Sequence, residues 1–311
     1  MHMLPRNLRS ARSALVVGIG GGGDIVSSIP IRNYLRRQGL RVVLGSTTWE
    51  RYVVDPEPGA RRLDEIMNIE RLSETSALAS GDTVSKKGVR FTASIVSEQL
   101  KERVLLLDPN LGVRGLVDGL LSAAKKLELD AVVGVDGGGD VLSSGSERNV
   151  RSLLLDSMML SAIVGLGMPS LLAVIGCCTD GELTLEEFLL QLSKVAKFGG
   201  IQGAEAVMPE DARMMEEIVP KTQSEVSRLI LAAWRGESGR FRIRGGSREA
   251  EVTPLAKIMF FIDPAVVLER INPVAKKLLK TRSLEEANEA VRMLGLPTEL
   301  DFERSLVGGR K

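Results

Sequence analysis

Residues 18–28 read GIGGGGDIVSS and residues 134–144 read GVDGGGDVLSS, so one stretch of this chain occurs twice, 116 residues apart. Each copy follows a short apolar run, at 14–17 and 131–133, which is the pattern of a buried parallel strand that leads into a turn. Consecutive glycines lose backbone entropy without gaining packing, so they indicate that the backbone lies close to another group, usually a ligand. Two such turns in one parallel sheet are expected at the same edge, the carboxyl ends of the strands.

The alternation of apolar and amphipathic segments predicts the order of the elements. We expect a long irregular stretch over 46–88 and strands at 14–18, 41–45, 89–96, 104–107, 131–135, 170–176 and 258–262. We expect a hairpin that joins 241–243 to 249–253, and helices at 25–38, 113–127, 147–164, 183–198, 212–234 and 264–294. This order predicts an α/β, Rossmann-like, doubly wound fold, in which a mostly parallel sheet carries helices on both faces. We expect an N-terminal extension (1–13) and a single α/β domain (14–311), whose more helical C-terminal part (200–311) contains the hairpin.

Composition excludes several classes of protein. Of 311 residues, 44% are hydrophobic and 26% are charged, which is typical of a globular chain. A net charge of +1 gives no support for a nucleic-acid partner, and no apolar run reaches the ~18 residues that span a bilayer. The two cysteines, Cys177 and Cys178, are adjacent, which favours apolar packing over a disulfide. We expect a cytoplasmic protein, and the excess of arginine over lysine is a feature that thermophile proteins share.

Histidine is nearly absent, and this restricts the chemistry. His2 is the only one, so a serine or cysteine triad with histidine and a histidine-based zinc or iron site are both excluded. Any enzymatic proton transfer must use other side chains or water. If the protein holds a metal, carboxylates and carbonyls bind it, which favours Mg²⁺ or Mn²⁺.

The first glycine turn also satisfies the dinucleotide pattern G-x-G-x-x-G over 18–23. That pattern requires an acidic residue at the end of the second strand for the ribose hydroxyls, and residues 43–47 contain none. Asp24 stands where a pyrophosphate would bind the helix N-terminus. The sequence therefore disfavours NAD(P), and neither turn is followed by the Gly-Lys-Ser/Thr of a P-loop.

Acidic residues on the two turns predict a cation site instead. Asp24, Asp136 and Asp140 should meet at one sheet edge, beside glycine amides that suit an anionic ligand. A structural alternative is that Asp24 and Asp140 are helix N-caps. Asp136 stands inside a glycine turn, where no cap is needed. A third loop with Asp180 follows the next strand; its structural alternative is an ordinary turn before a helix, with a capping box at Thr184 and Glu187.

Trp49 and Arg51 follow the second strand and are candidates for a lid or for stacking on a ligand base. The alternative is a structural tryptophan that covers the sheet edge. Both interpretations remain open at the level of the sequence.

The motifs together resemble a known family. Residues 18–24, residues 135–140, Glu147 with Asp156 downstream, and Asp180-Gly181-Glu182 are similar to an uncharacterised archaeal family, domain of unknown function 1152, over about residues 14–263. The resemblance implies a Rossmann-like α/β fold in a cytoplasmic archaeal protein, and it supplies no reaction. One difference is that the family's turn before Asp-Gly-Glu is usually glycine-rich, whereas this chain has Cys177-Cys178-Thr179.

These observations predict an enzyme that acts on a small anionic metabolite or nucleotide with a carboxylate-bound Mg²⁺ or Mn²⁺, by phosphoryl transfer or hydrolysis. The alternatives are a non-catalytic protein that senses such a ligand, and a scaffold subunit of a homo-oligomer. Catalysis requires carboxylate oxygens that converge to within about 4–5 Å. The candidate catalytic residues are Asp136, Asp140 and Asp180, and the candidate metal ligands are Asp24, Asp136 and Asp140. The candidate ligand-binding residues are Gly20, Gly21, Gly22, Gly23, Asp24, Trp49, Arg51, Gly137, Gly138, Gly139, Glu147 and Glu182.

Overall fold

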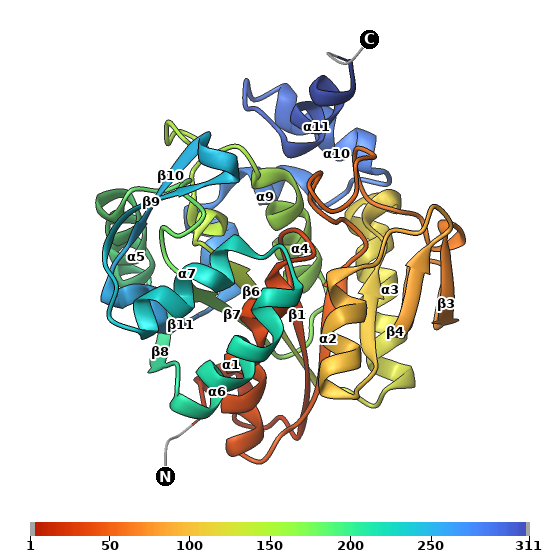
Figure 1. The fold of residues 1–311 in the computed structure, drawn as a ribbon, viewed down its shortest axis with the longest axis horizontal. Helices are drawn as coiled ribbons and strands as arrows, with labels where there is room; N and C mark the ends of the chain where they lie inside the picture. Colours follow the sequence, from red (N-terminus) through yellow and green to blue (C-terminus); the bar gives the residue numbers. More distant parts are fainter. Residues whose placement is uncertain (1–3, 309–311) are drawn as a thin grey trace.

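A nine-stranded sheet runs through the middle of the molecule (Figure 1). In the computed structural model, which describes residues 4–308, the strands follow the order β3 (Ile66–Arg71), β4 (Ser76–Ser85), β5 (Val104–Leu107), β2 (Arg41–Thr47), β1 (Ser13–Gly18), β6 (Ala131–Gly137), β7 (Ser170–Ile175), β11 (Ile258–Ile262) and β8 (Ile201–Ala206). The central strands from β5 to β7 are parallel, while β3, β4 and β11 pair antiparallel with their neighbours. The predicted α/β fold with a mostly parallel sheet is confirmed.

Helices cover both faces of this sheet. Successive residues of a strand point to opposite faces, so Val16 of β1 packs with one set of helices, while Leu15 and Val17 pack with the other. The first set is α1 (Asp24–Arg37), α2 (Thr92–Leu100), α6 (Pro209–Ile218) and α7 (Glu225–Trp234). The second set contains α3 (Gly112–Lys126), α4 (Leu153–Gly165), α5 (Leu185–Lys197), α9 (Pro273–Leu278), α10 (Leu284–Arg292) and α11 (Glu299–Gly308). Among the described residues, no helix is both long enough and apolar enough to cross a bilayer.

The strand order places both glycine turns at one point. From β1 the chain builds outward through β2 and β5, and it then returns to the other side of β1 to form β6 and β7. The strands β1 and β6 therefore flank the place where the winding direction reverses, and Gly18 pairs in register with Val135. Open α/β sheets bind ligands at such a switch point, beyond the carboxyl ends of the strands. The prediction that the two turns share one sheet edge is confirmed.

Two predictions for the first half of the chain are wrong. The stretch 46–88, predicted to be irregular, contains β3 and β4, in which apolar and polar residues do not alternate regularly. The predicted strand over 89–96 is replaced by α2, in which Ala93, Val96 and Leu100 face the sheet at helical spacing. The carboxylate of Glu50 accepts hydrogen bonds from the Thr92 amide (2.5 Å) and hydroxyl (2.9 Å), and so caps this helix from a distant segment.

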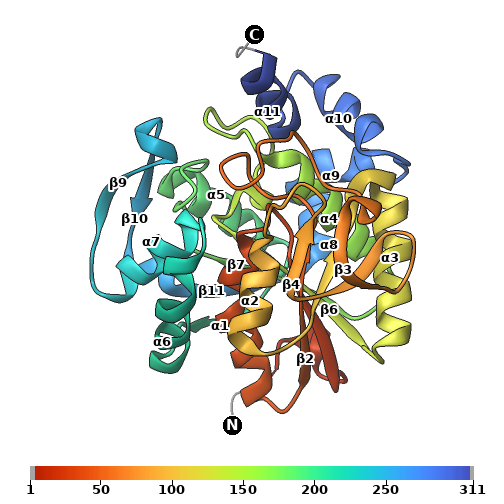
Figure 2. The same ribbon diagram turned by 45° about the vertical axis from the view of Figure 1, so that its right-hand side comes forward.

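Other boundaries also differ from the prediction. The helix expected from residue 147 begins only at Leu153, because the Glu147 carboxylate binds the Ser144 and Gly145 amides and holds this segment as a loop. β8 and α11 lie outside every predicted element. The hairpin is confirmed as β9 (Gly239–Ile243) and β10 (Arg248–Val252), and it stands beside the large sheet (Figure 2). The short helix α8 (Pro264–Val266) follows β11.

Candidate metal centre

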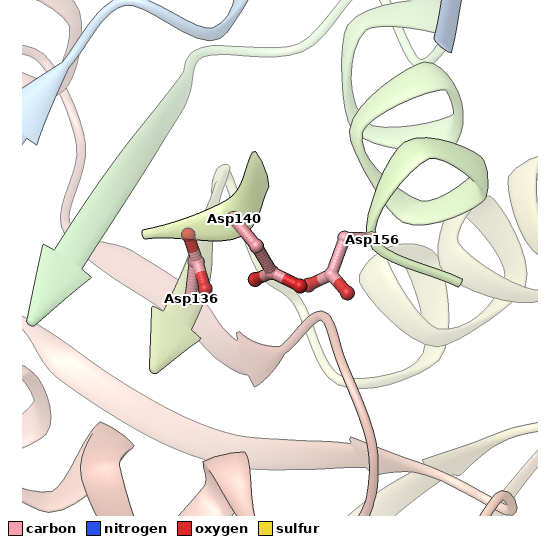
Figure 3. A group of neighbouring side chains, drawn as sticks. All are labelled: Asp136, Asp140 and Asp156. Carbon is pink, nitrogen blue, oxygen red and sulfur yellow. The ribbon is translucent and has the colours of Figure 1, made fainter. Parts of the chain in front are cut away.

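Three buried carboxylates meet beside the second glycine turn (Figure 3). Asp136 is the penultimate residue of the strand β6, Asp140 opens a short 3₁₀ helix (Asp140–Leu142), and Asp156 lies in the first turn of α4. One carboxylate oxygen from each lies within 4.8 Å of those of the others, and the residues are only 1%, 4% and 2% exposed. Oxygen atoms at this spacing are close enough to share one divalent cation.

Two of these buried carboxylates have an oxygen without a donor. Asp136 Oδ1 and Asp156 Oδ1 accept no hydrogen bond from the described residues. Asp136 Oδ2 accepts from the Val141 amide at 3.3 Å, and the Gly139 amide also stabilises Asp136. Asp140 Oδ2 accepts from the Ser152 hydroxyl at 3.2 Å. A buried acceptor without a donor costs about 1–3 kcal/mol, and more when it is charged. The donor set, all carboxylate oxygen, fits a hard cation such as Mg²⁺ or Mn²⁺.

A second group of carboxylates adjoins the first and shares Asp140 with it. Oxygens of Asp140, Asp180 and Glu182 also lie within 4.8 Å of one another. Asp180 has one unpartnered oxygen, Oδ2, whereas Glu182 accepts from the Arg151 and Ser152 amides and from Arg248. Asp180 is therefore free to interact with a ligand, and Glu182 serves to anchor the loop.

Burial, and then mutual repulsion, raise the pKa values of this cluster. Burial, then the charges of Asp24 and Asp180, raise the pKa of Asp136 well above its ordinary value. Burial and the charge of Asp156 raise the pKa of Asp140 well above its ordinary value. Burial and the charge of Asp136 raise the pKa of Asp156 in the same way. Burial also raises the pKa of Asp180 to about 7. A bound cation would lower these pKa values.

Asp24 joins the two glycine turns. Its carboxylate turns back to accept from the Gly20 amide (2.9 Å), and a Cβ atom on Gly137 would stand 3.0 Å from Asp24 Oδ1. Burial raises the pKa of Asp24 to about 6, against the attraction of Arg51. Neither Asp24 nor Asp140 caps its helix with its side chain, so the N-cap alternative is wrong for both.

Both glycine turns lie against carboxylates. A Cβ atom on Gly20 would stand 2.7 Å from Asp24 Oδ2 and 3.2 Å from Asp156 Oδ1, and one on Gly22 would stand 2.4 Å from the Glu50 carboxyl. The amides of Gly20, Gly22 and Gly138 already donate to Asp24, to the Trp49 carbonyl and to the Ile175 carbonyl. The glycines thus admit the acidic side chains, and these three amides are not free to hold an anion as the sequence suggested.

Gly138→Ala should destabilise the protein by at least about 3 kcal/mol, from backbone strain and steric overlap. Gly138 has φ +134°, and its Cβ atom would lie 2.4 Å from the Asp180 carboxyl carbon. Gly167→Ala is the matched control, since Gly167 also has a positive φ (+64°) but no atom within 4 Å of its Cβ position. Urea denaturation measures both, and equal losses would show that the approach of Asp180 is unimportant.

The remaining predicted site residues have structural contacts. Trp49 is buried in the core, and its Nε1 donates to Glu303 (3.0 Å), as the structural alternative predicted. Glu147 holds the loop after the second turn and accepts from Gln191 (2.7 Å). Cys177 and Cys178 are buried free thiols in the core. His2 lies outside the described residues.

Sequence analysis did not assign a site role to Asp156, Glu50 or Glu299. Asp156 is the only charged residue of the buried helix α4, and a lone acid on an apolar helix is a signal that could have identified it. Glu299 gave no such signal, yet its carboxylate accepts from the Leu154 (3.2 Å) and Leu155 (2.8 Å) amides at the start of α4. Because the N-terminus of α4 is fixed in this way, Asp156 is held in place.

A family model described as "Protein of unknown function (DUF1152)" matches residues 15–307. The chain belongs to this family. It matches no curated protein and no solved structure. Membership of DUF1152 brings no named reaction, so the chemistry of the acidic cluster has to be argued from its geometry.

Proposed function

We propose that this protein is an enzyme that uses Mg²⁺ or Mn²⁺ to act on a small anionic metabolite or nucleotide, by phosphoryl transfer or hydrolysis. The observation that carries the proposal is the group Asp136, Asp140 and Asp156, with oxygens within 4.8 Å of one another and two of them without donors. These three residues would hold the cation. The unpaired thiols fit a cytoplasmic location.

The surrounding residues can supply the rest of the chemistry. A bound divalent cation neutralises charge on a phosphoryl group and lowers the pKa of water. Asp180 stands next to Asp140 with Oδ2 free, so its carboxylate can accept a proton from a nucleophile. Asp24 keeps the two glycine turns in register, and Glu299 and Glu182 orient the helix that carries Asp156.

The alternatives explain less of the geometry. A scaffold accounts for glycine turns that pack against protein, but it gives no reason for buried oxygens without donors. A sensor accounts for a cation and a ligand, but it needs no proton acceptor such as Asp180. A measurement of substrate turnover distinguishes the two remaining hypotheses, an enzyme and a sensor.

Metal binding and turnover of the full chain test the proposal. After EDTA treatment, Mn²⁺ is titrated by calorimetry, and phosphate release is then measured from nucleotides, sugar phosphates and pyrophosphate. We expect Mn²⁺ binding and phosphate release in the wild type, and a loss of both by about 100-fold or more in Asp156→Asn. Asp118→Asn, an exposed acid on α3, is the control and should change neither. Absence of Mn²⁺ binding at millimolar concentration would refute the metal centre, and binding without turnover would favour a sensor.

A further inference from the structure

Arg51 faces the acidic cluster without a direct partner. Its side chain lies on the first glycine turn, where a Cβ atom on Gly21 would stand 2.6 Å from Arg51 Nε. Among residues 4–308 its guanidinium makes no ion pair within 4.0 Å and no hydrogen bond, although the charges of Glu299 and Asp156 act on it. Burial opposes the charge, but these carboxylates raise the pKa of Arg51 above its usual range. Its donors are therefore available to a bound molecule.

The hairpin β9–β10 brings two more arginines to the same site. Arg248 donates from Nη1 to Glu182 (2.7 Å) and to the Asp180 carbonyl (3.2 Å), and the Glu251 amide donates to the Cys178 carbonyl (3.3 Å). These bonds fix the hairpin to the loop that carries Asp180. Arg244 stands at the tip of the hairpin and is 36% exposed.

Arg244 is held in an unusual conformation. Its φ is +54°, in the left-handed region that non-glycine residues rarely adopt, and its amide is bound by the Glu225 carboxylate (2.9 and 3.0 Å). Burial, then the charges of Arg51 and Arg248, lower the pKa of Arg244. Backbone strain that is held by a carboxylate of another element makes Arg244 a candidate for a function.

We propose that Arg51, Arg244 and Arg248 bind a phosphate group of the substrate, so that the ligand is a phosphate ester or anhydride. Arginine presents several donors in a planar fork that matches phosphate oxygens, and Arg51 still has all of its donors free. A phosphate between the arginines and the carboxylates Asp136, Asp140 and Asp156 would have positive charge on both sides once the cation is bound. This inference deepens the proposed function and depends on it for the position of the cation. The binding of phosphate by the arginines does not depend on it.

The competing explanation is that the arginines only neutralise the acidic cluster. That explanation also accounts for the high pKa of Arg51, but it leaves two facts without a cause. A counter-ion would form direct ion pairs, as Arg248 does with Glu182, whereas Arg51 forms none among the described residues. It also gives no reason for strain at Arg244, whose Nε lies 3.5 Å from a carboxylate outside the cluster, that of Glu225.

Titration of inorganic phosphate into the full chain by calorimetry tests the proposal, once in EDTA and once with Mg²⁺. We expect phosphate to bind in both conditions, about 10-fold or more tightly with Mg²⁺, because the cation and the anion are neighbours. Arg51→Gln and Arg244→Gln should each weaken phosphate binding by about 10-fold or more. Arg242→Gln, an exposed arginine on the same hairpin, is the matched control and should bind as the wild type does.

Mg²⁺ titrated alone separates the two proposals. Removal of the positive charge in Arg51→Gln should leave Mg²⁺ affinity unchanged or raise it, since a cation competes with Arg51 for the same carboxylates. If Mg²⁺ does not bind but phosphate does, the proposed function fails and the phosphate site stands. If phosphate does not bind, or binds equally well in the arginine variants, or is displaced equally well by malonate, the phosphate site is refuted. Arg244→Gln, at an exposed tip, decides the question if Arg51→Gln does not fold.

Discussion

Raising the pH of the metal-free protein from about 5 to about 8 should lower its melting temperature by about 10 °C. Burial raises the pKa of Asp24 to about 6 and the pKa values of Glu50, Asp180 and Glu299 to about 7, all above their values in an unfolded chain. The native state therefore binds more protons than the unfolded state between about pH 4 and pH 7, and stability falls as the pH rises through this window. One pKa unit is about 1.4 kcal/mol, so even part of these shifts amounts to about 5 kcal/mol.

The composition of the chain makes the pH dependence of stability easier to assign to these carboxylates. His2 is the only histidine, so few other groups titrate between about pH 5 and pH 8. Mn²⁺ should restore the melting temperature at about pH 8 and have little effect at about pH 5, where protons occupy the carboxylates. Differential scanning calorimetry across the pH range, with and without Mn²⁺, measures both effects. A melting temperature that stays level or rises over this range would contradict the repulsive cluster.

Asp136→Asn should raise the stability of the metal-free protein at about pH 8 by about 1–2 kcal/mol and abolish the stabilisation by Mn²⁺. Asparagine keeps the shape of Asp136 but cannot ionise, so the repulsion from Asp24 and Asp180 disappears. The stabilisation lost would be about 4 kcal/mol where free Mn²⁺ exceeds its Kd by about 1,000-fold. Thermal unfolding of both proteins, with the exposed Asp118→Asn as control, gives the sign of each change.

A structural role for Asp136 predicts the opposite sign. In that case the bond from the Val141 amide to Asp136 Oδ2 (3.3 Å) stabilises the turn, and the loss of charge assistance should lower stability by about 1–2 kcal/mol. The unpartnered Oδ1 favours the first outcome. A destabilised variant that is still stabilised by Mn²⁺ would show that Asp136 is not a ligand of the metal centre.

The central sheet was predictable from the sequence because buried parallel strands appear as apolar runs before turns. The runs at 14–17 and 131–133 led directly to β1 and β6, and the hairpin followed from its paired glycines. The antiparallel strands β3 and β4 were not predictable in this way, since neither contains a continuous apolar run. α2 was mistaken for a strand because its first turn depends on Glu50, which lies far from it in the sequence.

The site was partly predictable for a related reason. Asp24, Asp136, Asp140 and Asp180 stand next to turns, so the sheet topology alone brings them together. Glu299 reaches the cluster only because α11 packs beside α4, and no local pattern encodes that contact. Helix caps were the structural alternative for Asp24 and Asp140 from local rules, but Asp24 accepts from the Gly20 amide and Asp140 from the Ser152 hydroxyl instead.

The pairing of β1 with β6 has a consequence for folding kinetics. Gly18 and Val135 are neighbours in the sheet but far apart along the chain, and Glu299 comes from near its end. Contacts between such distant segments close long loops and belong to the slower events of folding. Asp136 and Asp156 are only 20 residues apart along the chain, but Glu299 fixes the start of the helix that carries Asp156, so the three cation ligands would take up their final positions late. Cation binding would then slow unfolding without speeding folding, so cation supply would govern the lifetime of the native molecule.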